Sequence, residues 1–387
     1  MFRTLRNLIV NIMAAFIRDR DARHKFRNKY KRLSKFRKLR DDNRILFSHN
    51  IRLFKENKEI FKRLNAIQNQ FTKRNVFRFN QARINACQKF YAATTNEKYK
   101  KLVSGLDDES VDCVASILAR IKLVSERKLD NGDNVTGVAD IFSQKEKDLL
   151  DELRSNFSQK ILPLSDGNFA YKQYILPIKH FEASVFYYKH QINLLNDIYK
   201  LKNKDFIDVG GFIGDSALIF TEYTSGKIYS FEAVSKNYEN MLKTIELNNT
   251  KNIIPIKLGL GSKEEQTKIK IQGSGSTLTP NTFYYREDLP EEVISISTLD
   301  NFVDGKDLDI GLIKVDIEGF EQEFLKGAEK TIRKHKPAML LSIYHNPSDF
   351  FDIKPMIDSW NLGYKFKISH PVIGSIYGET LLICECD

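Results

Sequence analysis

The segment FIDVGGFIGDS, residues 206–216, has the residue types and the spacing of a ligand-binding turn. Its apolar run carries Asp208 and ends at Gly210 and Gly211, and Gly214 follows three residues later. A strand, a glycine turn and the start of a helix in this order let a ligand approach the main chain closely. The spacing G-G-x-x-G differs from the dinucleotide pattern G-x-G-x-x-G, so the segment alone fits a purely structural turn as well.

A second polar position supports a nucleoside site. The alternating segment KIYSFEAV, residues 227–234, carries Glu232 near its end, 18 residues after Gly214. In a doubly wound sheet, ligands bind at the carboxyl ends of the strands, and an acidic residue that ends the second strand can accept both ribose hydroxyls. The alternative is an exposed glutamate at a strand end. Together, the turn and Glu232 favour a cofactor that contains ribose.

The chain around these residues alternates between strands and helices from residue 205 onward. Two late strands, in YKFKIS and TLLICEC, are close enough in sequence to pair antiparallel. This alternation predicts an α/β fold, a parallel sheet with helices on both faces. The predicted strands are 206–209, 227–231, 253–258, 310–315 and 338–343, and the predicted helices lie near 214–223, 236–248, 320–334 and 350–360.

The segment LIKVDIEGFEQEFLKGAEKTI, residues 312–332, makes the pattern more specific. Together with DVGGFIGDS, FEA, the GLGS turn, the GSGS loop, SISTLD and IYHNPSDFF, it resembles FkbM-type S-adenosylmethionine-dependent methyltransferases over residues 205–387. The chain departs at Gly211, where the family usually has alanine, and at Ala233, where it usually has proline. Neither change removes a polar contact. The resemblance implies a seven-stranded Rossmann-like class I methyltransferase fold with a C-terminal antiparallel hairpin, and methylation of an oxygen, often on a sugar.

The resemblance also implies S-adenosylmethionine as the cofactor. The three glycines would then admit its methionine part, and Glu232 would bind its ribose. Asp208 could order the turn or meet the amino group through water. The residues after the third strand lie where the adenine edge is usually met, or they form an ordinary turn. The expected cofactor-binding residues are Asp208, Gly210, Gly211, Gly214, Glu232, Leu260, Gly261 and Ser262.

Two acids follow the fourth strand, beside the expected methyl position. Strand alternation puts Lys314, Asp316 and Glu318 on one side of the chain. Either acid could act as a base, bind a sugar hydroxyl or ligate a metal, and the alternative for both is helix capping. His345 follows the fifth strand and is a candidate base as a neutral imidazole, while Tyr344 alternates with it and should face away from the cleft.

The expected catalytic residues are therefore Asp316, Glu318 and His345. Together they could also bind a divalent metal, although the sequence does not establish one. Glu321 could reach the site as well. His370 and Glu379 flank the last loop and could close one edge of the pocket.

Basic residues are concentrated in the first hundred positions. Residues 1–100 hold 27 Lys and Arg against 7 Asp and Glu, whereas the rest of the chain holds 34 against 43. Apolar residues within 1–20 repeat at helical spacing beside arginines, which is typical of an amphipathic helix at a membrane interface. The alternatives are a helix that packs on its own domain or on a second copy of the chain. Spaced aromatics in the basic run 23–40 could stack on bases, but the helical period that follows disfavours nucleic acid.

The chain divides into three predicted regions. No stretch reaches the roughly 18 apolar residues that span a bilayer. Four cysteines without a disulfide framework indicate a reducing compartment. Segments 85–128 and 140–201 are predicted to be helical, and the Gly- and Asn-rich segment 129–138 predicts a linker. The regions are a basic amphipathic helical arm at 1–40, a mainly helical region at 41–200 and a methyltransferase domain at 201–387.

These observations predict an S-adenosylmethionine-dependent O-methyltransferase that acts on a sugar hydroxyl of a glycan or lipid-linked saccharide at a membrane face. The expected location is the cytoplasm, with peripheral contact at the inner membrane face through residues 1–40. A soluble small-molecule O-methyltransferase and a non-catalytic binding module with the same fold are the alternatives. A nucleic-acid methyltransferase ranks last, because the chain lacks the N-P-P-Y-type tetrapeptide of base amine methylation.

Overall fold

The structure is a computed structural model, and it describes residues 81–126, 141–279 and 287–386. All of them belong to one compact unit, Phe77–Asp387. The predicted arm at 1–40 and the predicted linker at 129–138 lie outside the described residues.

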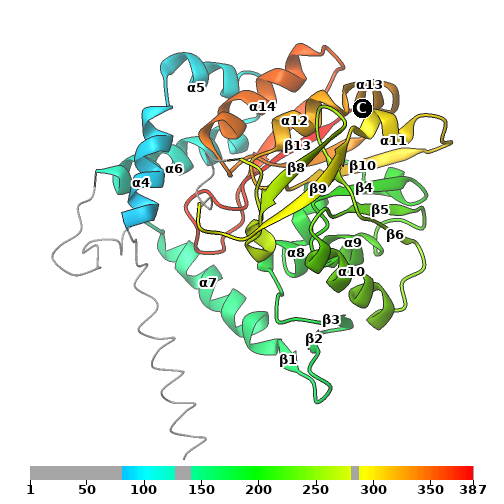
Figure 1. The fold of residues 1–387 in the computed structure, drawn as a ribbon. Helices are drawn as coiled ribbons and strands as arrows, with labels where there is room; N and C mark the ends of the chain where they lie inside the picture. The colour runs from blue at the N-terminus through cyan, green and yellow to red at the C-terminus, as the bar shows by residue number, and fades with distance from the viewer. Residues whose placement is uncertain (1–80, 127–140, 280–286, 387) are drawn as a thin grey trace, which may run out of the picture. The chain divides into compact units, whose positions relative to one another are not determined.

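A seven-stranded sheet forms the centre of this unit (Figure 1). The strand order is β12-β13-β11-β10-β4-β5-β6. Strand β13 runs antiparallel to both neighbours, and all other pairs are parallel. The predicted class I methyltransferase fold with its C-terminal hairpin is thereby confirmed. The strands are β4 (Asp205–Val209), β5 (Ile228–Phe231), β6 (Ile253–Ile256), β10 (Ile310–Val315), β11 (Ala338–Ser342), β12 (Lys365–Ser369) and β13 (Leu381–Glu385).

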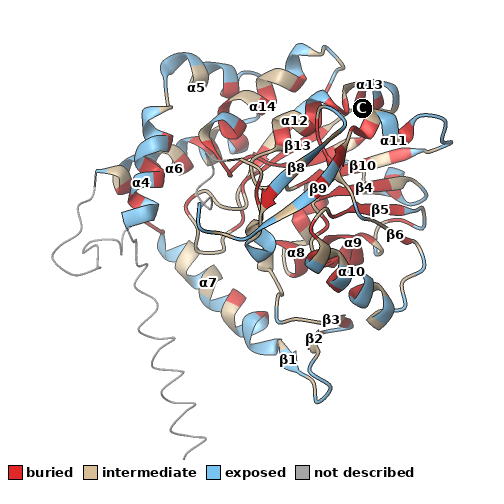
Figure 2. Cartoon of the chain, viewed as in Figure 1, coloured by how far each residue is buried: buried red, intermediate tan, exposed pale blue. Residues whose placement is uncertain are grey.

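Alternation along the buried strands divides the core into two layers. In β4, Ile207 and Val209 join one apolar cluster, whereas Phe206 joins the other. Both faces of the central strands are therefore buried, as Figure 2 shows for β4, β5 and β10. The helices between the strands are α9 (Asp215–Phe220), α10 (Ser235–Leu247), α11 (Leu299–Val303), α12 (Glu321–Lys326), α13 (Glu329–His335) and α14 (Pro347–Ser359).

Two of these helices differ from the predicted ranges for local reasons. The single helix expected near 320–334 is split into α12 and α13 at Gly327, where an added Cβ would lie 1.9 Å from the Gly261 carbonyl oxygen. Helix α14 begins three residues earlier than expected, because Asn346 caps it and Pro347 occupies its first turn.

Three helices before residue 127 pack onto the same core as the sheet. Phe90 stacks edge-on against Phe350 of α14, with ring centroids 5.1 Å apart. Ser110 accepts the Ile368 amide of β12 at 2.9 Å. The described part of the predicted helical region therefore shares a hydrophobic core with the predicted methyltransferase domain. These helices are α4 (Gln81–Ala92), α5 (Asn96–Val103) and α6 (Asp108–Ser125).

The segment from residue 141 to residue 204 is less helical than predicted. Only α7 (Gln144–Asn156) is a long helix, and a small antiparallel sheet follows it. Its strands are two or three residues long, too short for alternation to be recognised in the sequence. The remaining elements are η2 (Ser158–Lys160), β1 (Leu162–Pro163), β2 (Phe169–Tyr171), β3 (Tyr174–Leu176), α8 (Ala183–Phe186), η3 (Lys189–Leu194) and η4 (Ile198–Leu201).

A second small sheet covers the carboxyl end of the central one, in strand order β7-β9-β8. Its long pair β8 and β9 forms the ribbon in front of the central sheet in Figure 1. Over the described residues, no helix is long and apolar enough to cross a membrane. The elements of this excursion are β7 (Gly259–Leu260), β8 (Glu265–Lys270), η5 (Gly273–Gly275) and β9 (Glu291–Ser297).

Candidate active site

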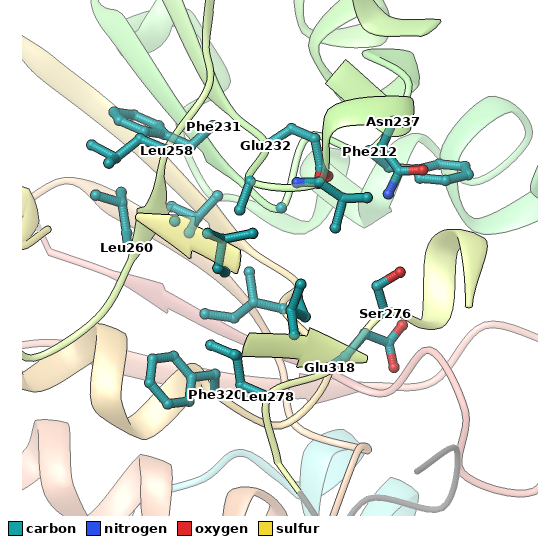
Figure 3. A pocket seen from close by; sticks show the side chains of 18 of the residues that line it. Phe212, Phe231, Glu232, Asn237, Leu258, Leu260, Ser276, Leu278, Glu318 and Phe320 are labelled. Atoms are coloured by element: carbon teal, nitrogen blue, oxygen red, sulfur yellow. The ribbon is translucent and has the colours of Figure 1, made fainter. Parts of the chain in front are cut away.

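Two cavities meet at the carboxyl ends of β4 and β10. The first, which we call the nucleoside cavity, has a largely apolar lining that includes Leu260 and Ile296. Figure 3 shows Glu232 and Glu318 on opposite sides of it, with Phe231, Leu258 and Leu260 together at one end. This combination of apolar walls and a few polar groups is typical of a small-ligand site.

The second cavity, which we call the acceptor cavity, has a polar lining. Carboxylates dominate it, and its cations Lys314 and His180 are each paired with a carboxylate. Five residues line both cavities, so the cavities are continuous at the ends of β4 and β10. The shared residues are Gly210, Phe212, Ser274, Asp316 and Glu318. The carboxylates of the acceptor cavity are Glu182, Asp215, Asp316, Glu318 and Glu379.

A buried polar row across three strands holds the glycine turn. Ser230, Asp208 and Lys314 are register neighbours on β5, β4 and β10. Ser230 donates to Asp208 at 2.6 Å, and Lys314 Nζ lies 3.3 Å from the other Asp208 oxygen. Lys314 also donates to the Gly210 carbonyl at 2.9 Å. Asp208 lines neither cavity, so of its two predicted roles the structure favours ordering the turn.

The three glycines of the turn serve close packing within the protein. Gly210 has φ +79°, and an added Cβ would lie 1.9 Å from the Asp316 carbonyl oxygen. At Gly211 an added Cβ would lie 2.1 Å from Ser230 Oγ, which explains glycine where the family usually has alanine. Gly214 has φ +81° and packs on Met241. Of these three glycines, only Gly210 lines the cavities, whereas Gly211 and Gly214 both lie against Met241.

Glu232 follows β5 and is the one carboxylate of the nucleoside cavity that the acceptor cavity does not share. Its Oε1 accepts the Val234 amide at 2.7 Å, which fixes the side chain. Burial raises the pKa of Glu232 to about 7, although the Val234 and Phe212 amides favour the ionised form. A fixed, partly desolvated carboxylate at this position can accept hydrogen bonds from ligand hydroxyls.

The predicted adenine segment contributes one residue to the cavity. Leu260 lines it, while Gly261 donates its amide to the Ser297 carbonyl at 2.9 Å and packs against Phe320. Ser262 donates to Glu323 at 2.6 Å and lines neither cavity. Leu260 is thus placed to contact a base, whereas Gly261 and Ser262 have structural contacts.

Asp316 and Glu318 lie at the junction of the two cavities, as strand alternation from Lys314 predicts. Glu318 has φ +54°, and its carbonyl accepts Thr277 Oγ1 at 2.7 Å, which helps to hold this unfavourable conformation. Burial raises the pKa of Glu318 to about 8. Burial also acts to raise the pKa of Asp316, but the hydrogen bond and charge of His345 outweigh it and bring that pKa to about 2.

His345 is fully buried and lines neither cavity. Its Nδ1 lies 2.9 Å from Glu321 Oε1, and its Nε2 lies 3.2 Å from Asp316 Oδ1 and 3.5 Å from Glu318 Oε2. Burial lowers the pKa of His345, but the charges of Glu321 and Glu318 outweigh burial and raise it well above the ordinary value. This shift favours the protonated ring, whereas the sequence predicts a neutral base, and the catalytic role of His345 stays a prediction.

Tyr344 lines the acceptor cavity, contrary to the expectation that it faces away. Strand β11 ends at Ser342, so strict alternation no longer applies two residues later. The Tyr344 hydroxyl lies 3.0 Å from Glu379 Oε1 and 3.5 Å from Asp316 Oδ1, and it links these two carboxylates.

Several residues that line the acceptor cavity could be predicted from the sequence only weakly or not at all. Asp215 follows directly on Gly214, so its place in the turn was a usable signal. Glu182 and His180 belong to the segment predicted as helix, where nothing marked them. Glu379 lies at φ +66° in the last loop and lines the cavity, whereas His370 does not and instead contacts the Ser375 carbonyl at 3.0 Å.

Comparisons with known proteins agree with this fold. A family model described as the methyltransferase FkbM domain matches residues 208–366. No curated protein matches the chain. Among solved structures, the FkbM methyltransferase of Methylobacillus flagellatus KT is similar at 18% identity and a TM-score of 0.46, over 74% of this chain and 58% of that protein. This chain therefore spans less than two thirds of the length of that relative.

Two further solved structures are similar at lower scores. An rRNA methylase from Streptococcus thermophilus has 12% identity and a TM-score of 0.30, over 49% of this chain and 92% of its own. The M. jannaschii TYW2, solved in complex with AdoMet, has 15% identity and a TM-score of 0.29, over 58% of this chain and 82% of its own. Because these structural similarities are weak, the assignment of the methyltransferase fold rests on the strand order and on the family model. Residues 208–366 thus match the FkbM methyltransferase domain, and the seven-stranded sheet around them has the strand order of a class I methyltransferase.

Proposed function

We propose that this chain transfers the methyl group of S-adenosylmethionine to a sugar hydroxyl of a glycan or lipid-linked saccharide at a membrane face. The observation that carries the proposal is the junction of two unlike cavities at Gly210, Asp316 and Glu318. An apolar cavity with one fixed glutamate suits a nucleoside, and a polar cavity rich in hydrogen-bond acceptors suits a polyhydroxyl acceptor.

The residues of the nucleoside cavity fit the cofactor. Glu232 would accept the ribose hydroxyls, because its carboxylate is fixed by the Val234 amide and faces the cavity. Leu260 and Phe231 would flank the base. The turn at Gly210, held by Lys314, would place the sulfonium end beside Asp316. The donor supplies an electrophilic methyl carbon at that point.

The acceptor-cavity residues fit the second half of the reaction. Asp316 and Glu318 would hold the acceptor hydroxyl at the junction, where proximity and alignment supply most of the rate. The acceptor oxygen then bonds to the methyl carbon as the carbon–sulfur bond breaks and leaves a neutral thioether. Glu379 would accept the hydroxyl proton, since it shares the Tyr344 hydroxyl with Asp316 and burial raises its pKa to about 8, near the range of an effective base.

The membrane part of the proposal rests on the sequence. The basic amphipathic segment within residues 1–40 supports contact with an anionic membrane surface, whereas residues 101–387 hold 34 Lys and Arg against 43 Asp and Glu. A helix that pairs with a second copy of the chain would use the same apolar residues. On the basis of the same segment, the proposal also places the protein in the cytoplasm, at the inner face of the membrane.

Three experiments test the proposal. Isothermal titration with S-adenosylhomocysteine should give saturable heat, and labelled methyl groups should enter a saccharide fraction that mass spectrometry identifies. No heat at high protein concentration would reject the enzyme and leave a non-catalytic scaffold. Flotation with anionic liposomes should carry the full chain but leave behind a variant without residues 1–40. Equal flotation, or label found only in a small soluble product, would favour a soluble small-molecule methyltransferase.

A further inference from the structure

Two acids at the junction and the adjacent, fully buried His345 have the spacing of ligands around one metal ion. His345 Nε2 lies 3.2 Å from Asp316 Oδ1 and 3.5 Å from Glu318 Oε2. Adjacent ligands of an octahedral ion with bonds of about 2.1 Å lie about 3 Å apart. A small inward shift of Glu318 would bring its oxygen to that distance from Nε2.

Hydrogen bonds within the described residues do not account for this arrangement. His345 is fully buried, yet neither of its ring nitrogens makes a hydrogen bond of good geometry. Glu318 Oε2 also has no hydrogen-bond partner, although it is shielded from solvent. Buried polar atoms are normally satisfied, because an unmet donor or acceptor costs free energy. An ion between Nε2 and the two junction carboxylates would satisfy Nε2 and Glu318 Oε2 together.

Glu321 supplies the outer contact that a metal-binding histidine usually has. Its Oε1 lies 2.9 Å from His345 Nδ1 and accepts the Ile317 amide at 2.9 Å, so the carboxylate is fixed in place. A ligating imidazole generally donates its other N–H to a carboxylate, which sets the ring orientation. One ligand atom from each of Asp316, Glu321 and His345 lies within 4.8 Å of the other two. Nδ1 faces Glu321, so Nε2 is directed toward the two junction acids.

The backbone at Glu318 is also held in place. Glu318 and Gly319 both have positive φ, at +54° and +95°. Their carbonyls accept the hydroxyls of Thr277 and Thr279, at 2.7 Å and 3.1 Å, from the loop that follows β8. Unfavourable backbone conformations that are held in this way cluster at ligand sites.

We propose that Asp316, Glu318 and His345 Nε2 bind a divalent cation of the magnesium and manganese class at the junction of the two cavities. Two carboxylates and one imidazole, with room for water or an acceptor oxygen, suit this class better than softer metals. Its role rests on the proposed function. A bound ion would coordinate the acceptor hydroxyl and lower its pKa, so that the proton passes more readily to Glu379.

The test is a titration of the chelator-treated full chain with Mn²⁺ at pH 8, followed by the loss of the free-ion electron paramagnetic resonance signal. The wild type should bind one ion. Asp316→Asn and His345→Gln should each weaken binding by at least tenfold, and Glu321→Gln by about tenfold as an outer contact. Glu182→Gln is the matched control, because it removes a charge from the same cavity at a residue outside the cluster.

Two outcomes would overturn the site: no Mn²⁺ binding by the wild type, or equal binding by the wild type, Asp316→Asn and His345→Gln. Retained S-adenosylhomocysteine binding shows that each variant is folded. The metal site and the methyltransferase proposal can fail separately. Full methyl transfer in chelator would reject the proposed role of the ion in the reaction, whereas Mn²⁺ binding without S-adenosylhomocysteine binding would reject the proposed function and leave the metal site in place.

Discussion

The nucleoside cavity and the acceptor cavity share one junction but differ in how they use charge. Outside the junction, the first has apolar walls and a single carboxylate, Glu232, whereas the second gathers Glu182, Asp215 and Glu379. Burial raises the pKa of Asp215 to about 7 and that of Glu379 to about 8, so ionised carboxylates are unfavourable there until something compensates them. In the proposed function, cofactor binding and preparation of the acceptor for reaction therefore belong to different cavities.

The largest expected effect comes from the junction. Asp316→Asn should lower kcat by about 100- to 1,000-fold, because it removes a positioned charge beside the reacting oxygen. S-adenosylhomocysteine affinity should change by less than about threefold, since Asp316 contacts His345 and Tyr344 rather than Glu232. Labelled-methyl incorporation and calorimetry measure the two quantities. A loss of cofactor affinity as large as the loss of kcat would remove the distinction between the cavities.

The next effect belongs to the nucleoside cavity. Glu232→Ala should weaken S-adenosylhomocysteine binding by about 100-fold, because hydrogen bonds to a charged acceptor contribute about 1.5–3 kcal/mol each. Calorimetry at saturating protein measures the change. Asn237→Ala, at a neighbouring residue that lines the same cavity, is the control and should cost less. If Glu232→Ala bound the ligand as tightly as the wild type, this carboxylate would have no role in ribose recognition.

The pH dependence of cofactor binding should follow Glu232. Burial raises the pKa of this residue to about 7, and the ionised form is the better acceptor for ribose hydroxyls. Affinity for S-adenosylhomocysteine should therefore be constant above that pH and fall by up to about tenfold per unit below it. Calorimetry from pH 5.5 to 8.5 measures the profile, and Glu232→Gln should flatten it. An unchanged profile in the variant would assign the dependence to another group.

The smallest effect concerns stability at the acceptor cavity. Burial, together with the charges of Glu182 and Asp316, raises the pKa of Glu379 from 4.5 to about 8, while Ser184 and Tyr344 oppose the shift. The native state therefore binds more protons than the unfolded state between these values, and stability falls as pH rises through this window. Glu379→Gln cannot ionise, so its melting temperature should exceed that of the wild type increasingly from pH 4.5 to pH 8.

Glu109→Gln is the control for this prediction, since it removes an exposed carboxylate on α6. Thermal melts in matched buffers compare the three proteins. If the melting temperatures of the wild type and Glu379→Gln changed with pH in parallel, ionisation of Glu379 would not destabilise the fold. The test links function to stability, because groups poised for chemistry commonly reduce the stability of the fold.

The sequence predicted the sheet and the junction better than the acceptor cavity. The strand ends at Gly210, Glu232 and Asp316 were predictable because apolar runs and turn residues define them locally. The environment of His345 could not be predicted, because the fold brings Glu321 and Glu318 to the ring and the local sequence pattern does not indicate these contacts. The small sheet at β1–β3 and the cavity residue Glu182 could not be predicted, because short strands and long-range packing leave no periodic pattern.

The most direct test of the two-cavity account is a crystal structure of the chain with S-adenosylhomocysteine. The account predicts the ribose on Glu232, the base beside Leu260, and the sulfur at Gly210 facing Asp316 and Glu318. A ligand bound elsewhere, or one whose sulfur points away from the acceptor cavity, would contradict it.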